Sequence, residues 1–205
     1  ALNILKSAHE PCFVSIRSSA ANEDLENKSF TGQQQTFLNI KGEAKLTEKI
    51  KECFAGMYTK TSMSNLKISE NEYKQQTTAV IIQKMIDSEK SGIIYTKDPT
   101  KKQEQSVIEA IFGLGSGLVR GEITPDKYVT KNLEINNIEV KDKKIAYVRT
   151  GSGETEVVRL NNEKSNTQVL TKGEIIELSN IAIRLKTLFK KELNIEFAIE
   201  ETRPY

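Results

Sequence analysis

Two segments of the chain combine residue types that bind phosphate or a metal ion. The first is SIRSSAANEDLENKSFTGQQQTFLNI, which carries Arg17, the hydroxyls of Ser18 and Ser19, Gly32 and Thr36. A guanidinium binds phosphate oxygens with paired donors, and a glycine lets backbone N–H groups approach an anion closely. The segment therefore predicts a polyphosphate cradle, with a surface arginine beside a polar loop as the alternative.

The second segment is NIEFAIEETRPY, at the end of the chain. Mg²⁺ takes one or two carboxylates plus substrate phosphates, and a nearby arginine neutralises charge on a transferred phosphoryl group. Alternation of Ile195, Phe197 and Ile199 with other residues places Glu196 on the opposite side of a strand. Glu196 is therefore a candidate metal ligand near Arg203, and an acidic side chain on a solvated strand face is the alternative.

A third segment, GLGSGLVRGEITPD, is rich in glycine and follows the run VIEAIF. Gly113 and Gly115 have the G-x-G form of a dinucleotide fingerprint, but Leu118 stands where the third glycine is required. The fingerprint fails, and the segment is interpreted as a tight turn between sheet elements.

Composition excludes several classes of protein. Hydrophobic residues make up 37% and charged residues 28% of the 205 residues, as in globular domains, and the net charge is +2. That balance lacks the basic excess of a nucleic-acid binder. No apolar run approaches the roughly 20 residues that cross a bilayer, and ALNILKSAHE lacks a signal peptide's apolar core, so we expect a cytoplasmic protein without membrane contact. One histidine and two isolated cysteines predict neither a zinc site nor a disulfide framework.

Local patterns predict the elements that carry these residues. CFVSIR predicts a strand ending at Arg17, before a polar loop. TFLNI predicts a second strand at Thr36–Ile40, and apolar residues at helical spacing predict a helix over about residues 43–58. Apolar runs between Thr78 and Gly113 predict the strands of one sheet.

The second half of the chain changes pattern twice. Short alternating runs with turn residues predict a small β-meander at Lys127–Leu160. Thr171 and Glu174 form a capping box, from which apolar periodicity continues to about Leu193, followed by a strand at Asn194–Glu200. Together the elements predict an α+β fold, with a mixed β-sheet flanked by helices and the meander as a smaller part.

In their order along the chain, these segments resemble the nucleotide-binding domain of the pyruvate/phosphoenolpyruvate dikinase family, which has an ATP-grasp fold. The resemblance is carried by VSIRSSAANEDLENKSFTGQQQTFLNIKG, AVIIQKMIDSEKSGIIYTKDP, VIEAIFGLGSGLVRGEITPDKYV and ELNIEFAIE with TRPY. Within the family, SFTGQQQTFLNI is similar to the phosphoenolpyruvate synthase and rifampicin phosphotransferase branch. The resemblance covers almost the whole chain.

The resemblance implies a role for particular nucleotide-binding residues. Arg17 matches the phosphate-binding arginine, and Gly32 and Thr36 match the loop that contacts ATP. Gln83, in VIIQKM, occupies a strand position that contacts nucleotide. Arg203 matches the ATP-binding arginine of the terminal Q-x-R-P motif.

The resemblance also implies a magnesium site. Glu196 matches the metal-binding glutamate, whereas Asn194 stands where many relatives have an acidic residue. The family inserts a short strand and a metal-binding glutamine before Arg-Pro, and Glu201 takes that place here; a deletion of the segment is the alternative.

The implied function is that of a partial ATP-grasp domain over residues 1–205, binding ATP with Mg²⁺ for a pyruvate, water dikinase. The phosphohistidine domain of the same enzyme would be its partner and pyruvate the acceptor, bound by a further barrel. These domains and the start of the N-terminal lobe are not in this sequence, so we expect no turnover by the chain alone. An ATP domain of a rifampicin phosphotransferase and a non-catalytic nucleotide-binding module are the alternatives.

Overall fold

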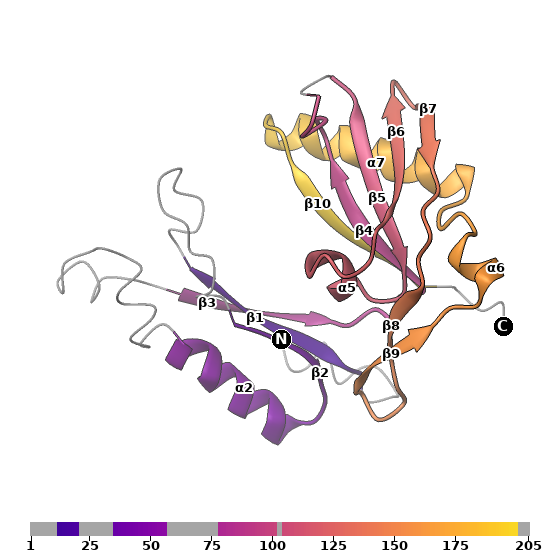
Figure 1. Cartoon of the computed structure of the whole chain (residues 1–205). Coiled ribbons are helices and arrows are strands. Elements are labelled where there is room, and N and C mark those ends of the chain that lie inside the picture. The colour runs from indigo at the N-terminus through magenta and orange to yellow at the C-terminus, as the bar shows by residue number, and fades with distance from the viewer. Residues whose placement is uncertain (1–11, 21–34, 57–77, 102–103, 201–205) are drawn as a thin grey trace, which may run out of the picture. The chain divides into compact units, whose positions relative to one another are not determined.

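A computed structural model describes residues 12–20, 35–56, 78–101 and 104–200 of the chain (Figure 1). The chain divides between Met85 and Ile86 into two units, called here the N-terminal unit and the C-terminal unit. Among the described residues, no helix has the length and apolar character needed to cross a membrane.

In its described residues, the N-terminal unit is a three-stranded antiparallel sheet with one helix packed on it. The strand order is β2-β1-β3, so the first strand is central. Its elements are β1 (Val14–Ala20), β2 (Thr36–Ile40), α2 (Glu43–Gly56) and β3 (Thr78–Lys84). The predicted strand at Thr36–Ile40 is confirmed, and the predicted helix is confirmed over its described residues.

A small core joins helix α2 to the sheet. Leu46 and Cys53, seven residues apart on α2, lie on one helix face and pack with Val14 and Ile16 of β1. Ile16 is fully buried. This packing closes one face of the sheet and leaves the alternate side chains of β1 on the other face.

The C-terminal unit is built on a five-stranded antiparallel sheet in the order β10-β4-β5-β6-β7. Strands β8 and β9, which come between β7 and β10 along the chain, form a separate two-stranded sheet. The strands are β4 (Lys90–Tyr95), β5 (Ser106–Phe112), β6 (Asp126–Lys131), β7 (Glu134–Glu139), β8 (Ile145–Arg149), β9 (Thr155–Arg159) and β10 (Asn194–Ile199). The described helices are α5 (Ser116–Val119), α6 (Asn162–Ser165) and α7 (Lys172–Phe189).

Helix α7 covers one face of this sheet (Figure 1). Its predicted capping box is confirmed, because the Thr171 hydroxyl accepts from the Glu174 N–H and the Glu174 carboxylate accepts from the Thr171 N–H. Ile175 packs against the row of Ile94, Ile108 and other apolar residues on β4 and β5. The helix ends at Phe189, four residues before the predicted end.

Three sequence-based expectations about the sheets are wrong. The pairings among the described strands are antiparallel rather than mixed, because the consecutive strands β4 to β7 each return beside the strand before, and the long connections to β3 and β10 also bring those strands back antiparallel. Strand Thr78–Lys84 joins the N-terminal unit instead of the sheet formed by the next two strands. The meander expected at Lys127–Leu160 is divided, since β6 and β7 extend the large sheet while β8 and β9 pair with each other.

The first strand also differs from its prediction. It runs to Ala20 rather than ending at Arg17, because β3 pairs with β1 residue by residue from Lys84 through Thr78. Arg17 therefore lies in the middle of a central strand, where pairing on both sides holds its backbone.

Candidate functional site

Three predicted nucleotide-binding residues lie on one face of the sheet in the N-terminal unit. Arg17 is the direct cross-strand partner of Thr36 on β2 and of Ile81 on β3. Gln83 pairs with Ser15, two residues from Arg17, so its side chain lies on the same face. The pairing thus brings together residues that are far apart in the sequence.

This face is the one that α2 does not cover. The adjacent pair Ile16 and Ile82 points into the core shared with α2, so Arg17 and its neighbours point the other way. Ile81, the neighbour of Arg17 on the outer strand β3, is 49% exposed. A guanidinium, a hydroxyl, an amide and an apolar side chain therefore lie on one side of the sheet.

In the C-terminal unit, Glu196 belongs to a row of residues that crosses the large sheet. The register pairs Glu196 with Ile93, Ile93 with Glu109, Glu109 with Lys127, and Lys127 with Glu139. The neighbouring row consists of core residues that face α7, so the charged row lies on the opposite face. Strands about 4.8 Å apart place the Cα atoms of Glu196 and Glu109 about 10 Å from each other.

The predicted alternation in β10 is confirmed. Asn194, Glu196 and Ala198 are exposed, whereas Ile195 and Phe197 are half-buried against the core. The strand therefore presents one exposed carboxylate from its centre, as the sequence predicts. Whether Glu196 binds a metal stays a prediction.

The donor set around Glu196 fits Mg²⁺ better than a softer metal. Among the described residues, no group of three or more histidine, cysteine, aspartate or glutamate side chains could hold a metal ion by itself. Mg²⁺ does not need such a group, since it binds through one or two carboxylates while phosphates and water complete its octahedron. An exposed glutamate on a strand is compatible with that mode.

The charged row shifts the pKa values of neighbouring groups. Burial raises the pKa of the Tyr95 phenol, and the charge of Glu109 raises it further. An ion pair with Lys141 lowers the pKa of Glu139, and Lys127 adds to this effect. The face that carries Glu196 therefore bears both acidic and basic side chains.

The glycine-rich segment is a structural turn, which confirms the interpretation that the sequence favoured. Gly113 has a φ of +79°, and a Cβ there would lie 2.2 Å from the carbonyl oxygen of Tyr147. Its carbonyl oxygen accepts from the hydroxyls of Ser91 at 2.6 Å and Ser88 at 3.2 Å, and its N–H donates to Glu89. Only glycine combines this conformation with so close an approach.

Three predicted site residues, Gly32, Glu201 and Arg203, lie outside the described residues. Arg17 and Glu196 belong to different units. The expectation that Arg17, Glu196 and Arg203 face one cleft therefore stays a prediction.

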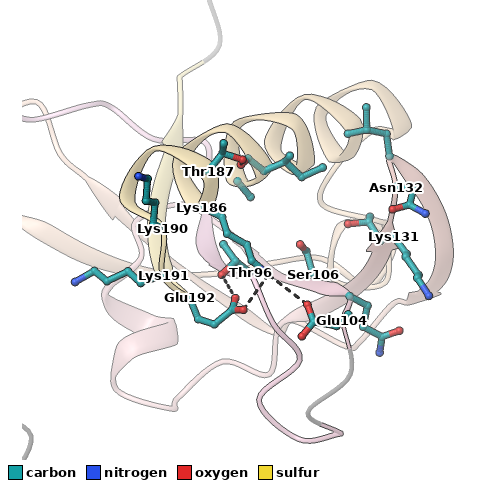
Figure 2. A pocket seen from close by; sticks show the side chains of 15 residues that line it. Thr96, Glu104, Ser106, Lys131, Asn132, Lys186, Thr187, Lys190, Lys191 and Glu192 are labelled. Carbon is teal, nitrogen blue, oxygen red and sulfur yellow. Dashed lines mark hydrogen bonds and ion pairs between the residues drawn. The ribbon is translucent and has the colours of Figure 1, made fainter.

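A pocket of about 790 Å³ lies in the C-terminal unit (Figure 2), and its lining contains none of the predicted site residues. Its walls come from the end of β4, the start of β5, the turn between β6 and β7, and the last part of α7. Figure 2 shows Lys186 lying between Glu104 and Glu192, with Lys190 and Lys191 on one side and Lys131 on the other. Sequence reasoning missed this pocket, because its lining residues come from separated segments.

Sequence reasoning also missed a buried ion pair. Asp126 and Lys143 are fully buried, and the Lys143 Nζ donates to the Asp126 carboxylate at 2.5 Å. The same carboxylate accepts from the N–H groups of Lys141 and Val169 and from the Tyr128 hydroxyl. The Asp126 carboxylate thus links β6 to two later segments of the chain. Lys143 lies in the polar run KDKK, whose composition does not indicate that this lysine is buried.

The two polar sheet faces carry the residue types that a nucleotide-binding domain uses, and comparison with known proteins gives the class. The chain matches the family described as "Pyruvate phosphate dikinase, AMP/ATP-binding domain" over residues 1–204. It belongs to this family, as the resemblance of its motifs implied.

Named relatives agree with this assignment. The chain is 36% identical over 195 residues to a "Probable phosphoenolpyruvate synthase" of Archaeoglobus fulgidus, covering 94% of this chain and 26% of that protein. It is 34% identical to a protein of the same name from Methanocaldococcus jannaschii, with 94% and 16% covered. A "Rifampicin phosphotransferase" of Bacillus cereus is also 34% identical, with 93% and 22% covered. The chain thus spans about a quarter or less of the length of these relatives.

Proposed function

We propose that this chain is the ATP-handling part of a multidomain dikinase of the phosphoenolpyruvate synthase type. The whole enzyme transfers the β-phosphoryl group of ATP, through a carrier histidine of another domain, to pyruvate. The products are phosphoenolpyruvate, AMP and phosphate. The family's AMP/ATP-binding description and the names of the archaeal relatives support this proposal.

The observation that carries the proposal is the common face of Arg17, Thr36 and Gln83. Register alone brings these side chains to one side of the sheet, opposite the side that α2 covers. In the proposed site, the Arg17 guanidinium binds phosphate oxygens with paired charge-assisted hydrogen bonds. The Thr36 hydroxyl donates to the same group, and the Gln83 amide contacts the nucleotide.

Glu196 supplies the proposed metal ligand. Its carboxylate is a hard oxygen donor on an exposed strand position, which is the ligand chemistry that Mg²⁺ prefers. When bound, Mg²⁺ neutralises charge on the phosphate oxygens. Glu201 would provide a second carboxylate.

The proposed transfer begins when the carrier histidine nitrogen attacks the β-phosphorus of ATP. The bond between the β-phosphorus and the oxygen bridging to the α-phosphate breaks, and AMP leaves with that oxygen. Water then releases the terminal phosphate from the pyrophosphoryl-histidine. Arg17 and Arg203 hold the charge on the phosphates in place, which is the main contribution of a protein to phosphoryl transfer.

The test uses the full-length protein with ATP, Mg²⁺ and pyruvate. Formation of AMP, phosphate and phosphoenolpyruvate in equal amounts is expected. ADP as the nucleotide product, or pyruvate-independent hydrolysis with no phosphoenolpyruvate, would contradict the proposal.

A second candidate acceptor is rifampicin, because the phosphotransferase from Bacillus cereus is nearly as similar as the archaeal synthases. Replacing pyruvate by rifampicin in the same assay separates the two acceptors. Conversion of ATP to AMP only with rifampicin would select the phosphotransferase. Binding of ATP without AMP formation under either condition would select a non-catalytic module.

A further inference from the structure

The pocket at the end of α7 has a size typical of small-molecule sites. Its volume of about 790 Å³ lies within the range of about 300–1,000 Å³ that such sites occupy. The lining contains none of the residues proposed to bind ATP or metal, although Thr96 and Glu192 lie within family motifs.

The acidic side chains of the pocket are already neutralised by neighbours. Glu192 accepts from Lys186 at 2.9 Å and from the Thr96 hydroxyl at 2.8 Å. Glu104 pairs with Lys97 at 3.2 Å and with Lys186 at 3.4 Å. These ion pairs lower the pKa of both carboxyl groups, so both stay ionised and paired near neutral pH.

The remaining charged groups of the lining are cations. Lys186 is held in ion pairs with Glu192 and Glu104. Within the described part of the chain, no ion pair is found for the other three lysines of the lining, Lys131, Lys190 and Lys191. Figure 2 places them around the rim, on both sides of the paired carboxylates. The pocket therefore carries a positive potential that its own acids do not cancel.

An apolar surface completes the lining. Leu133 is 41% exposed and Ile183 is 42% exposed, and Ala182 lies beside them. Contact with water at these side chains is unfavourable, so an apolar group that covers them would be stabilised. A ligand that satisfies the pocket combines an apolar body with negative charge.

The backbone at two lining residues adds an independent observation. Lys190 has a φ of +53° at the end of α7, and Leu133 has a φ of +64° in the turn between β6 and β7. Both positions favour glycine, because a side chain in the left-handed region costs about 1 kcal/mol. At both positions the chain nonetheless carries a long side chain at the pocket.

We propose that this pocket binds a small organic anion, a carboxylate or a phosphate ester on an apolar body. The anionic group lies beside Lys190 and Lys191 at the end of α7, and the body covers Leu133 and Ile183. This site shares no residue with the proposed ATP site and does not depend on the proposed dikinase activity.

The test measures binding of phenyl phosphate and benzoate to the full-length protein by ligand-observed NMR and calorimetry. Benzyl alcohol and inorganic phosphate are the controls that lack one half of the ligand. Both aromatic anions are expected to bind more tightly than either control, with or without saturating ATP. Failure of both anions to bind, or their displacement by ATP, would overturn the proposal.

Two variants locate the site without threatening the fold. Lys190→Gly and Leu133→Gly remove a pocket side chain at positions where glycine relieves backbone strain, so neither is expected to lower thermal stability. Lys190→Gly should weaken phenyl phosphate binding about three- to fivefold, the effect of losing one exposed charge contact. Leu133→Gly should weaken phenyl phosphate but not inorganic phosphate.

The matched control is Lys144→Gln, because the Lys144 side chain is 82% exposed and lies outside the pocket lining. It should leave both anions bound as before. Equal weakening by Lys144→Gln and Lys190→Gly would show a general charge effect and overturn the assignment. Should Lys190→Gly fold poorly, Lys191→Gln measures the same contact.

Discussion

Arg17 and Thr36 face each other across the pairing of β1 and β2, although 18 residues separate them in the sequence. The pairing puts a guanidinium and a hydroxyl on the same side of the sheet, opposite the side that α2 covers. Gln83 reaches the same side through β3. This arrangement is rigid, because β1 is paired with a strand on each side. Donors that are already held in position lose less entropy when they bind a phosphate group.

Arg17→Met should weaken ATP binding to the full-length protein about 10- to 100-fold, since charge-assisted hydrogen bonds contribute about 1.5–3 kcal/mol. Adenosine binding should change little, because adenosine has no phosphate. Calorimetry with both ligands measures the difference. Lys45→Met, on the exposed side of α2, is the control, and ATP affinity equal to that of the wild type in Arg17→Met would remove Arg17 from the site.

Glu196→Gln should abolish most ATP-to-AMP conversion while the fold survives. The change keeps the size and strand position of the side chain but removes the charge that a hard cation requires. A solvated glutamate would instead change stability by less than about 0.5 kcal/mol and leave the rate intact. The measurement is the rate of AMP formation against Mg²⁺ concentration, with Glu134→Gln on β7 of the same sheet as control.

An unchanged rate and an unchanged Mg²⁺ dependence in Glu196→Gln would remove the metal assignment. Glu201→Gln is the informative companion, because it introduces the residue that the family carries at the second ligand position. Activity retained there, together with loss at Glu196, would support a shortened but working C-terminal motif.

Lys143→Met should destabilise the protein by about 3–5 kcal/mol, because it leaves the Asp126 charge buried without its cation. Urea unfolding monitored by circular dichroism measures the loss. Adding Asp126→Leu should not restore stability, since the N–H groups of Lys141 and Val169 then lose their acceptor. Recovery in the double variant would show that the pair alone, and not the network, carries the effect.

Asp98 predicts a pH dependence of stability. Hydrogen bonds from the Lys101 N–H, the Gln105 amide and the Thr100 N–H lower the pKa of its carboxyl group, which is 2% exposed. A lowered pKa in the folded state means that the contribution is present above the unfolded pKa of about 3.9 and is lost as the pH falls below it. The stability difference between wild type and Asp98→Asn should therefore shrink below about pH 4.

Denaturant unfolding at several pH values between neutral and acid conditions measures this difference. Glu154→Gln, an exposed substitution in the turn between β8 and β9, is the control and should show no such trend. A constant difference across the whole range would contradict the assigned role of Asp98.

The sequence alone determined the elements whose causes are local. The capping box of Thr171 and Glu174 and the apolar spacing that follows fixed the start and face of α7, because the contacts involved are three or four residues apart. Alternation in Asn194–Ile199 determined which side of β10 carries Glu196. The order of the motifs determined the family.

Only the tertiary structure decided which strands became neighbours. β10 pairs with β4 across roughly half the chain, with Leu193 bonded to Thr96 at a separation of 97 residues. Local patterns carry no information about such partners, which is why Thr78–Lys84 was assigned to the wrong sheet and the pocket around Lys190 was missed. Pairing and burial depend on apolar surface and backbone hydrogen bonds that segments far apart in sequence satisfy together.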